Sequence, residues 1–124
     1  MTLRLTPDVL AGAYELNRAT HPISAWRLPL SKYVEFRVTR SRKHIGYCQK
    51  ASFAPDAHFI LEFSERTIGS YQTLLVFMAH ELCHMRQMIE KTETKGVEHN
   101  QAFCRLAYQV AKAQGWDPKL LVWW

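Results

Sequence analysis

YQTLLVFMAHELCHMRQMIEK, residues 71–91, carries the strongest secondary-structure signal in this 124-residue chain. Its apolar residues recur every three or four positions, which is the period of an amphipathic helix: Leu74, Leu75, Met78, Leu82, Met85 and Ile89. Ser70 stands directly before the stretch and is a typical N-cap residue. The spacing therefore predicts a helix over 71–91, and the apolar residues around its centre predict that it is buried.

The centre of this helix reads His80-Glu81-Leu82-Cys83-His84, an H-E-x-x-H motif. Residues four apart on a helix lie about 40° apart around its axis, so His80 and His84 point to the same place. Two imidazoles placed in this way can share one Zn²⁺ ion. Glu81 is rotated by about 100° from His80, which suits a carboxylate that takes a proton from metal-bound water.

A catalytic zinc site needs a third protein ligand and one open position. Five downstream side chains are candidates: Glu90, Glu93, Glu98, His99 and Asp117. The first two turn away from the histidines, and the last lies far along the chain. Glu98 and His99 open the next predicted helix, which can turn back across the first. His99 shares a face with Phe103, whereas Glu98 lies about 100° off that face. We therefore expect His99, ahead of Glu98, to complete a site for one Zn²⁺ per chain.

Three short segments with alternating apolar and polar residues predict strands. They are Tyr33–Thr39, His44–Ser52 and Ala57–Phe63. Their short connections favour an antiparallel meander in chain order. The third strand directly precedes the metal-binding helix. As a sheet edge, it would be able to pair with an extended substrate peptide.

Two further helices complete the predicted order of elements. Thr6-Pro7-Asp8 combines an N-cap, a proline at the first helical position and an acid in the first turn, so a helix is expected over 7–19. A last helix is expected over 98–114, with Gly115 as its C-cap. The order of one helix, three antiparallel strands and two helices that carry the metal site predicts an α+β fold. One domain over 1–124 is expected.

The composition excludes several classes of protein. The chain is 48% apolar and 22% charged, which excludes wholesale disorder. Its three cysteines form no C-x-x-C pair, which excludes a four-cysteine zinc ribbon and argues against a disulfide scaffold. No signal-peptide pattern opens the chain, and no apolar run is long enough to cross a bilayer. A cytoplasmic protein without membrane contact is therefore expected.

Other residues outside the motif are secondary candidates. Basic residues cluster around the connection of the first two strands: Arg37, Arg40, Arg42 and Lys43. Because no aromatic platform accompanies them, only weak and salt-sensitive contact with nucleic acid is expected. An oxyanion-stabilising residue would come from Tyr33, Tyr47, Tyr71 or His58. We expect three tryptophans near the C-terminus to cover one end of the hydrophobic core: Trp116, Trp123 and Trp124.

The run Met78–His84, followed by His99-Asn100-Gln101-Ala102-Phe103, resembles the SprT-like zinc metallopeptidases. A looser resemblance extends the match to about residues 10–114 and includes Ala13–Asn17, Gly46–Cys48 and Phe59–Leu61. The resemblance implies a minimal zincin-like metallopeptidase domain that acts on a protein or peptide substrate. It also implies that His80, His84 and His99 bind the metal and that Glu81 is the general base.

Two departures from the family pattern stand out. Asn100 occupies the position after the third histidine, where the family commonly has glycine. No cysteine-rich zinc ribbon follows the domain within this chain, so the DNA-linked role of some family members is not implied. We expect a zinc-dependent metallopeptidase in which Glu81 takes a proton from metal-activated water. The alternatives are a non-catalytic zinc-binding module and a small nucleic-acid-associated domain that uses the basic residues at 37–43.

Overall fold

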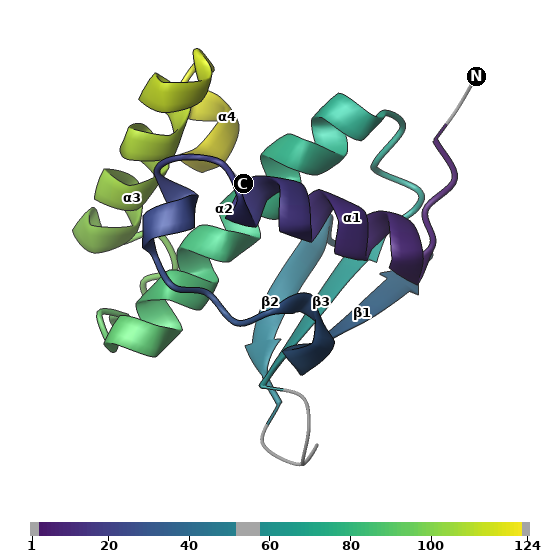
Figure 1. Cartoon of the computed structure of the whole chain (residues 1–124), viewed down its shortest axis with the longest axis horizontal. Coiled ribbons are helices and arrows are strands. Elements are labelled where there is room, and N and C mark those ends of the chain that lie inside the picture. Colours follow the sequence, from purple (N-terminus) through teal and green to yellow (C-terminus); the bar gives the residue numbers. More distant parts are fainter. Residues whose placement is uncertain (1–2, 52–57, 123–124) are drawn as a thin grey trace.

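A three-stranded sheet and four α-helices make up the described part of the chain, residues 3–51 and 58–122 of this computed structural model (Figure 1). The helices are α1 (Pro7–Arg18), α2 (Tyr71–Glu90), α3 (Gln101–Gln114) and α4 (Lys119–Val122). Two short 3₁₀ turns follow α1 in the chain, Ile23–Ala25 and Ser31–Tyr33. The strands are β1 (Val34–Thr39), β2 (Gly46–Lys50) and β3 (Phe59–Ser64). The α+β class agrees with the sequence prediction, whereas α4 was not predicted.

β3 lies in the centre of the sheet, parallel to β1 and antiparallel to β2. The predicted antiparallel meander is therefore wrong, and so is the idea that the third strand is a sheet edge. The strand order β1-β3-β2 follows from burial: every residue of β2 is at least partly exposed, which suits an edge strand. The core-facing residues of β3 are all buried: Phe59, Leu61 and Phe63. Residues 40–45 carry the chain from β1 past the end of β3, where the Ser64 N–H donates to the Ile45 carbonyl at 2.8 Å.

The bounds of β2 and β3 differ from the predicted bounds by one or two residues. β2 starts two residues after the predicted position 44 and ends at Lys50. β3 begins at Phe59 and extends one residue beyond the predicted position 63. The expected end of the second strand at residue 52 and the expected start of the third at residue 57 lie outside the described residues.

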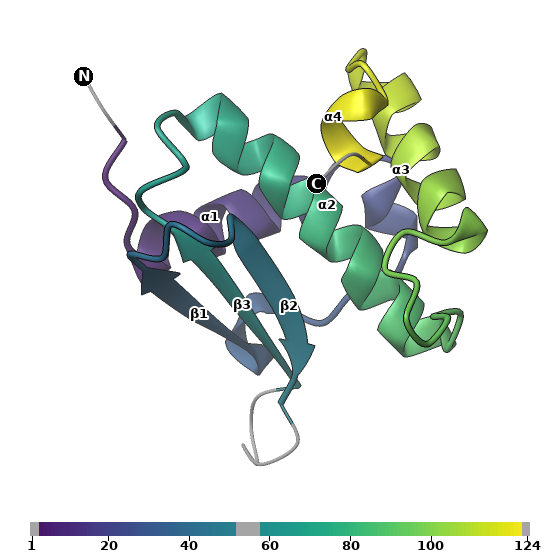
Figure 2. The ribbon, with the colours of Figure 1, turned by 180° about the vertical axis from the view of Figure 1, so that it is seen from behind.

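Helices α1 and α2 cover the same face of the sheet. The Tyr14 ring of α1 packs edge-on against Phe36 of β1, with 5.5 Å between the ring centroids. Phe36 and Cys48 are the register partners of Leu61 on its two sides, so all three side chains point to one face. α2 packs against β2, and its Glu81 carboxyl group lies beside Cys48, so this helix covers the same face. Seen from behind, α2 runs beside β2 and in the same direction (Figure 2).

Local capping interactions set the ends of the helices. Thr6 and Ser70 each accept a hydrogen bond at 3.1 Å from a backbone N–H three residues ahead, as their N-cap positions predict. The Asn100 side chain caps α3 in the same way at 2.9 Å. This helix therefore starts three residues after the predicted position 98. Gly115 ends it with φ of 74°, a left-handed conformation that glycine adopts at low cost.

α2 is the central element of the core and contacts α1, α3, α4 and β2. Most of its predicted apolar positions are buried, although Ile89 is 41% exposed.

Trp116 is half-buried against the core, in line with its predicted covering role, whereas residues 123 and 124 lie outside the described residues. Within the described residues, no helix has the length and apolar character that crossing a membrane requires.

Candidate metal centre

Three histidines meet beside the middle of α2. His80 and His84 come from α2, and His99 comes from the turn before α3. Their ligand nitrogens all lie within 4.8 Å of one another, so the group could hold a metal ion. The ring centroid of His80 lies 4.9 Å from those of His84 and His99, and the centroids of His84 and His99 are 5.3 Å apart. These are the three histidines that the sequence analysis selected, and Glu98 lies outside the group.

Phe103 packs against all three imidazoles. Its ring centroid lies 5.0 Å from that of His80 and 4.5 Å from those of His84 and His99. The Phe103 side chain is fully buried and belongs to the hydrophobic core. One core residue therefore limits the positions that the three rings can adopt. Its separation of four residues from His99 was the sequence signal for this contact.

The turn that carries His99 has a defined backbone structure. Thr94 and Val97 pair across it as an isolated antiparallel bridge. Gly96 has φ of 80°, where a residue with a Cβ would be strained. His99 is half-buried at the end of this turn and lies directly before the N-cap of α3.

Asn100 fastens this turn to α2 and to α3. Its amide nitrogen donates to the Thr92 carbonyl and to the Thr94 hydroxyl, both at 2.9 Å. Its amide oxygen accepts from Gln87 of α2 at 2.8 Å and from the N–H of Phe103 at 2.9 Å. We call these interactions the Asn100 clamp. The capping role of Asn100 was not predicted from the sequence, although an asparagine before a helix is a known capping signal.

His80 is held by the C-terminal part of the chain. Its Nδ1 lies 2.6 Å from the carbonyl oxygen of Leu121 in α4. Because a carbonyl only accepts hydrogen bonds, Nδ1 carries the proton and Nε2 keeps its lone pair. Such a partner fixes the tautomer and orientation of a metal-binding histidine. The sequence did not predict this contact, because the two residues lie far apart in the chain and the acceptor is a backbone atom.

Burial keeps the histidines of α2 neutral. Burial, together with the nearby His84 and His99, lowers the pKa of His80 to about 3, although the hydrogen bond to Leu121 opposes this shift. Burial and the neighbouring His99 lower the pKa of His84 to about 4. Both imidazoles are therefore unprotonated at neutral pH, which is the state that binds a metal.

Glu81 lies beside the histidines and is only 3% exposed. Burial and the nearby Glu98 carboxylate raise the pKa of Glu81 to about 8, and a hydrogen bond from the backbone N–H of Cys48 opposes this shift. Positive charge held at the three histidines would favour the ionised form of this carboxyl group. The contact with Cys48 also places the Glu81 carboxyl group against β2.

An open cleft of about 1010 Å³ runs along this site. One wall is the segment 43–48, which leads into β2, and the other is the turn 93–99. His80, Glu81 and His84 line the cleft between these walls, and Met88 lines it one turn further along α2. Because β2 is an edge of the sheet, it replaces β3 as the strand beside which an extended peptide could lie.

The other sequence candidates are dispersed. Among the residues considered for oxyanion stabilisation, Tyr47 lines the cleft, whereas Tyr33, Tyr71 and His58 do not belong to its lining. Two of the four basic residues at 37–43 are paired: Arg37 with Glu35 at 2.9 Å and Arg40 with Glu65 at 2.6 Å. These ion pairs reduce the positive charge that this region offers to a phosphate.

A scan against protein-family models and a search of curated proteins both find no match to this chain.

Proposed function

We propose that this protein is a zinc-dependent peptidase similar to the SprT-like metallopeptidases. The observation that carries the proposal is the convergence of His80, His84 and His99 beside the buried Glu81 in the wall of an open cleft. Three histidines with a neighbouring carboxylate are typical of a hydrolytic zinc site, because three protein ligands leave one position open.

The donor set fits zinc. Three imidazoles form a borderline-soft nitrogen site of the kind that zinc accepts. The neutral state of His80 and His84 and the hydrogen bond from His80 to Leu121 suit metal ligation without rearrangement. A zinc ion bound there would polarise a substrate carbonyl and make water more acidic.

In this proposal Glu81 moves the proton. Its carboxylate accepts a proton from the attacking water and returns it to the nitrogen of the leaving amine. The backbone N–H of Cys48 holds the carboxyl group in place, and burial excludes bulk water from it. The exposed edge of β2 would align an extended peptide beside Glu81 through main-chain hydrogen bonds.

We also assign the protein to a reducing compartment such as the cytoplasm. All three cysteines lie in the described part of the chain, and none forms a disulfide there. Cys83 is fully buried in the core, which matches a structural thiol. Free cysteines are typical of reducing compartments.

The test combines metal analysis with the Glu81→Gln variant. We expect about one zinc per chain in the wild type and in the variant, because Glu81 is not one of the three ligands. Cleavage of unfolded casein should fall at least about 100-fold in the variant, the low end of what a general base contributes. Equal cleavage by both proteins would refute the role of Glu81. Zinc-loaded wild type that cleaves no casein and no broad peptide library would favour the non-catalytic zinc module.

A further inference from the structure

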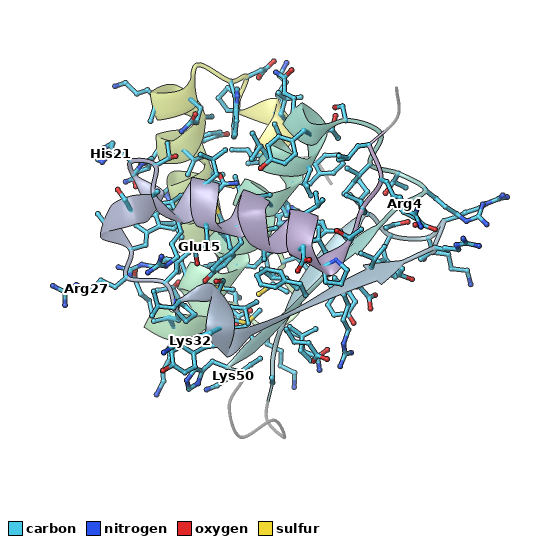
Figure 3. All side chains as sticks on the ribbon, turned by 45° about the vertical axis from the view of Figure 1, so that its right-hand side comes forward. Arg4, Glu15, His21, Arg27, Lys32 and Lys50 are labelled. Atoms are coloured by element: carbon cyan, nitrogen blue, oxygen red, sulfur yellow. The ribbon has the colours of Figure 1, made fainter. Side chains whose placement is uncertain are left out.

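A second hollow lies next to the cleft, and positively charged side chains surround it. It measures about 340 Å³, and the charged side chains in its lining are Arg27, Lys50 and Lys91. We call it the cationic hollow. Apart from His58, its other lining residues among those described are apolar or proline, and none is acidic. Figure 3 shows Arg27 and Lys50 on the same side of the molecule, together with Lys32.

The charges of the hollow are not neutralised within the described chain. Arg27, Lys50 and Lys91 are exposed, and none of them forms an ion pair with a described residue. The neighbouring Glu90 of α2 is already paired with Arg86. Three free cations around one small concave surface create a positive potential that attracts an anionic group.

The hollow adjoins the cleft that contains the candidate metal centre. Met88 lines both cavities and lies four residues after His84 on α2. Four residues of helix, a rise of about 6 Å, therefore separate His84 from Met88 at the start of the hollow. β2 leads from the candidate metal centre to the hollow as well. Its Cys48 contacts Glu81, and Lys50 lies two residues further along the strand. That step is about 7 Å, or two residues of an extended peptide.

From this placement we infer that the cationic hollow binds an acidic side chain of the substrate, two or three residues from the bond that is cleaved. The inference rests on the proposed peptidase function and adds a substrate class to it. A peptide that lies along the edge of β2 places every second side chain on the same side. One of these side chains then reaches Lys50 and Lys91, while the main chain lies beside Glu81.

A peptide carboxylate fits this surface better than a nucleic acid. Single-stranded nucleic acids need exposed aromatic rings on which bases can stack. Among the described residues that line the hollow, Phe59 is the one phenylalanine, and it is only 5% exposed. The exposed Ile89 and the half-buried Met88 would instead contact the aliphatic part of a glutamate side chain.

The first experiment measures cleavage of a peptide series in which one glutamate moves from three residues before the cleaved bond to three residues after it. For zinc-loaded wild type, kcat/KM should be highest at one position, two or three residues from the bond, by about fivefold over the neutral peptide, as expected for exposed charge pairs. Lys50→Glu should abolish the preference and favour lysine at that position. Lys112→Glu is the control, because Lys112 is exposed and lines neither cavity.

The second experiment measures binding and does not depend on turnover. Fluorescence anisotropy compares the best glutamate peptide with its glutamine analogue on wild type, Lys50→Glu, Lys91→Glu and Lys112→Glu. Both variants of the hollow should weaken binding of the glutamate peptide about fivefold, within the range of exposed charge pairs, and leave the glutamine peptide unchanged. Equal affinity of wild type and both variants for the glutamate peptide overturns the inference, whether or not cleavage is found. A single-stranded oligonucleotide that binds more tightly through the same lysines also overturns it.

Discussion

His99 is the member of the histidine group that comes from outside α2, so its proposed contribution to zinc binding can be separated from that of its neighbour Glu98. We predict that His99→Ala weakens zinc binding at least about 100-fold, the upper end of the loss seen when an outer-shell partner is removed. Glu98→Ala should change zinc affinity little, because Glu98 lies outside the histidine group. Competition with a fluorescent chelator measures both constants. The opposite ranking of the two variants would show that Glu98 is the ligand.

The buried histidines and Glu81 give the metal-free protein an unusual dependence on pH. The unfolded chain binds more protons than the folded protein below pH 6.5, because the pKa values of His80 and His84 fall to about 3 and about 4 on folding. Stability is therefore lost as pH falls through that range. The pKa of Glu81 rises from 4.5 to about 8 on folding, so above pH 6.5 the folded protein binds more protons and stability is lost as pH rises.

We therefore predict that the unfolding free energy of the metal-free protein is greatest near pH 6.5. Urea titrations with a chelator present should show a loss of roughly 1 to 2 kcal/mol between pH 6.5 and pH 8. Glu81→Gln should remove this loss and leave the loss on the acid side. A wild-type stability that still rises between pH 6.5 and pH 8 would contradict the prediction.

At the scale of elements, the Asn100 clamp joins the turn that carries His99 to α2. We predict that Asn100→Ala lowers zinc affinity about tenfold, as for other partners that orient ligands, and lowers stability by about 1 kcal/mol through loss of the cap. Asn100→Asp separates the two effects. Its carboxylate still caps α3, but it cannot donate to Thr92 and Thr94.

The aspartate variant should therefore keep most of the stability and lose zinc affinity to a similar extent as the alanine variant. Chemical denaturation and chelator competition on the same samples measure the two quantities. Wild-type zinc affinity in Asn100→Asp would mean that the amide donors of the clamp do not position His99.

The helices were more predictable from sequence than the sheet, for a physical reason. Helix period and capping residues are local, so Thr6, Ser70 and Gly115 mark their helix ends correctly. Alternation along a strand predicts which face is buried but not which strands are neighbours. That choice depends on how much apolar surface each strand must bury, and the greater burial of β3 places it in the centre.

The metal site shows the same contrast. The grouping of His80, His84 and His99 could be predicted. The first two lie one helical turn apart on α2, and His99 lies four residues before the core residue Phe103, although α3 itself begins only at Gln101. The hydrogen bond from His80 to the Leu121 carbonyl and the Asn100 clamp could not be predicted. Both are tertiary contacts, and the groups that form them, a backbone carbonyl and a side-chain amide, occur throughout any chain. The sequence therefore predicted which histidines come together, but not the groups that hold them in place.

At the scale of the whole molecule, a bound metal would link α2 to the segment before α3. Under the proposed function, zinc would bind only the folded state and would stabilise it by mass action. We predict that removal of zinc by a chelator lowers Tm by about 10 °C relative to protein in zinc at 100 times Kd, where the stabilisation is about 2.7 kcal/mol. Differential scanning calorimetry measures the shift, and added zinc should reverse it.

His84→Ala is the matched control for this measurement. It removes a ligand from a half-buried position, so its Tm should not respond to zinc. A wild-type Tm that stays the same after verified metal removal would show that the histidine group does not couple metal binding to folding.

The central position of β3 also has a consequence for synthesis on the ribosome. β1 and β2 both pair with β3 and are separated by it, yet both precede it in the chain. A nascent chain that ends before Phe59 therefore has two strands whose ladder partner has not yet been made. Each exposes unpaired backbone groups of the kind that pair with other chains. The carbonyl partner of His80 arrives later still, at residue 121. Translation speed over the second half of the message thus determines how long these strand edges stay open to aggregation or to a chaperone.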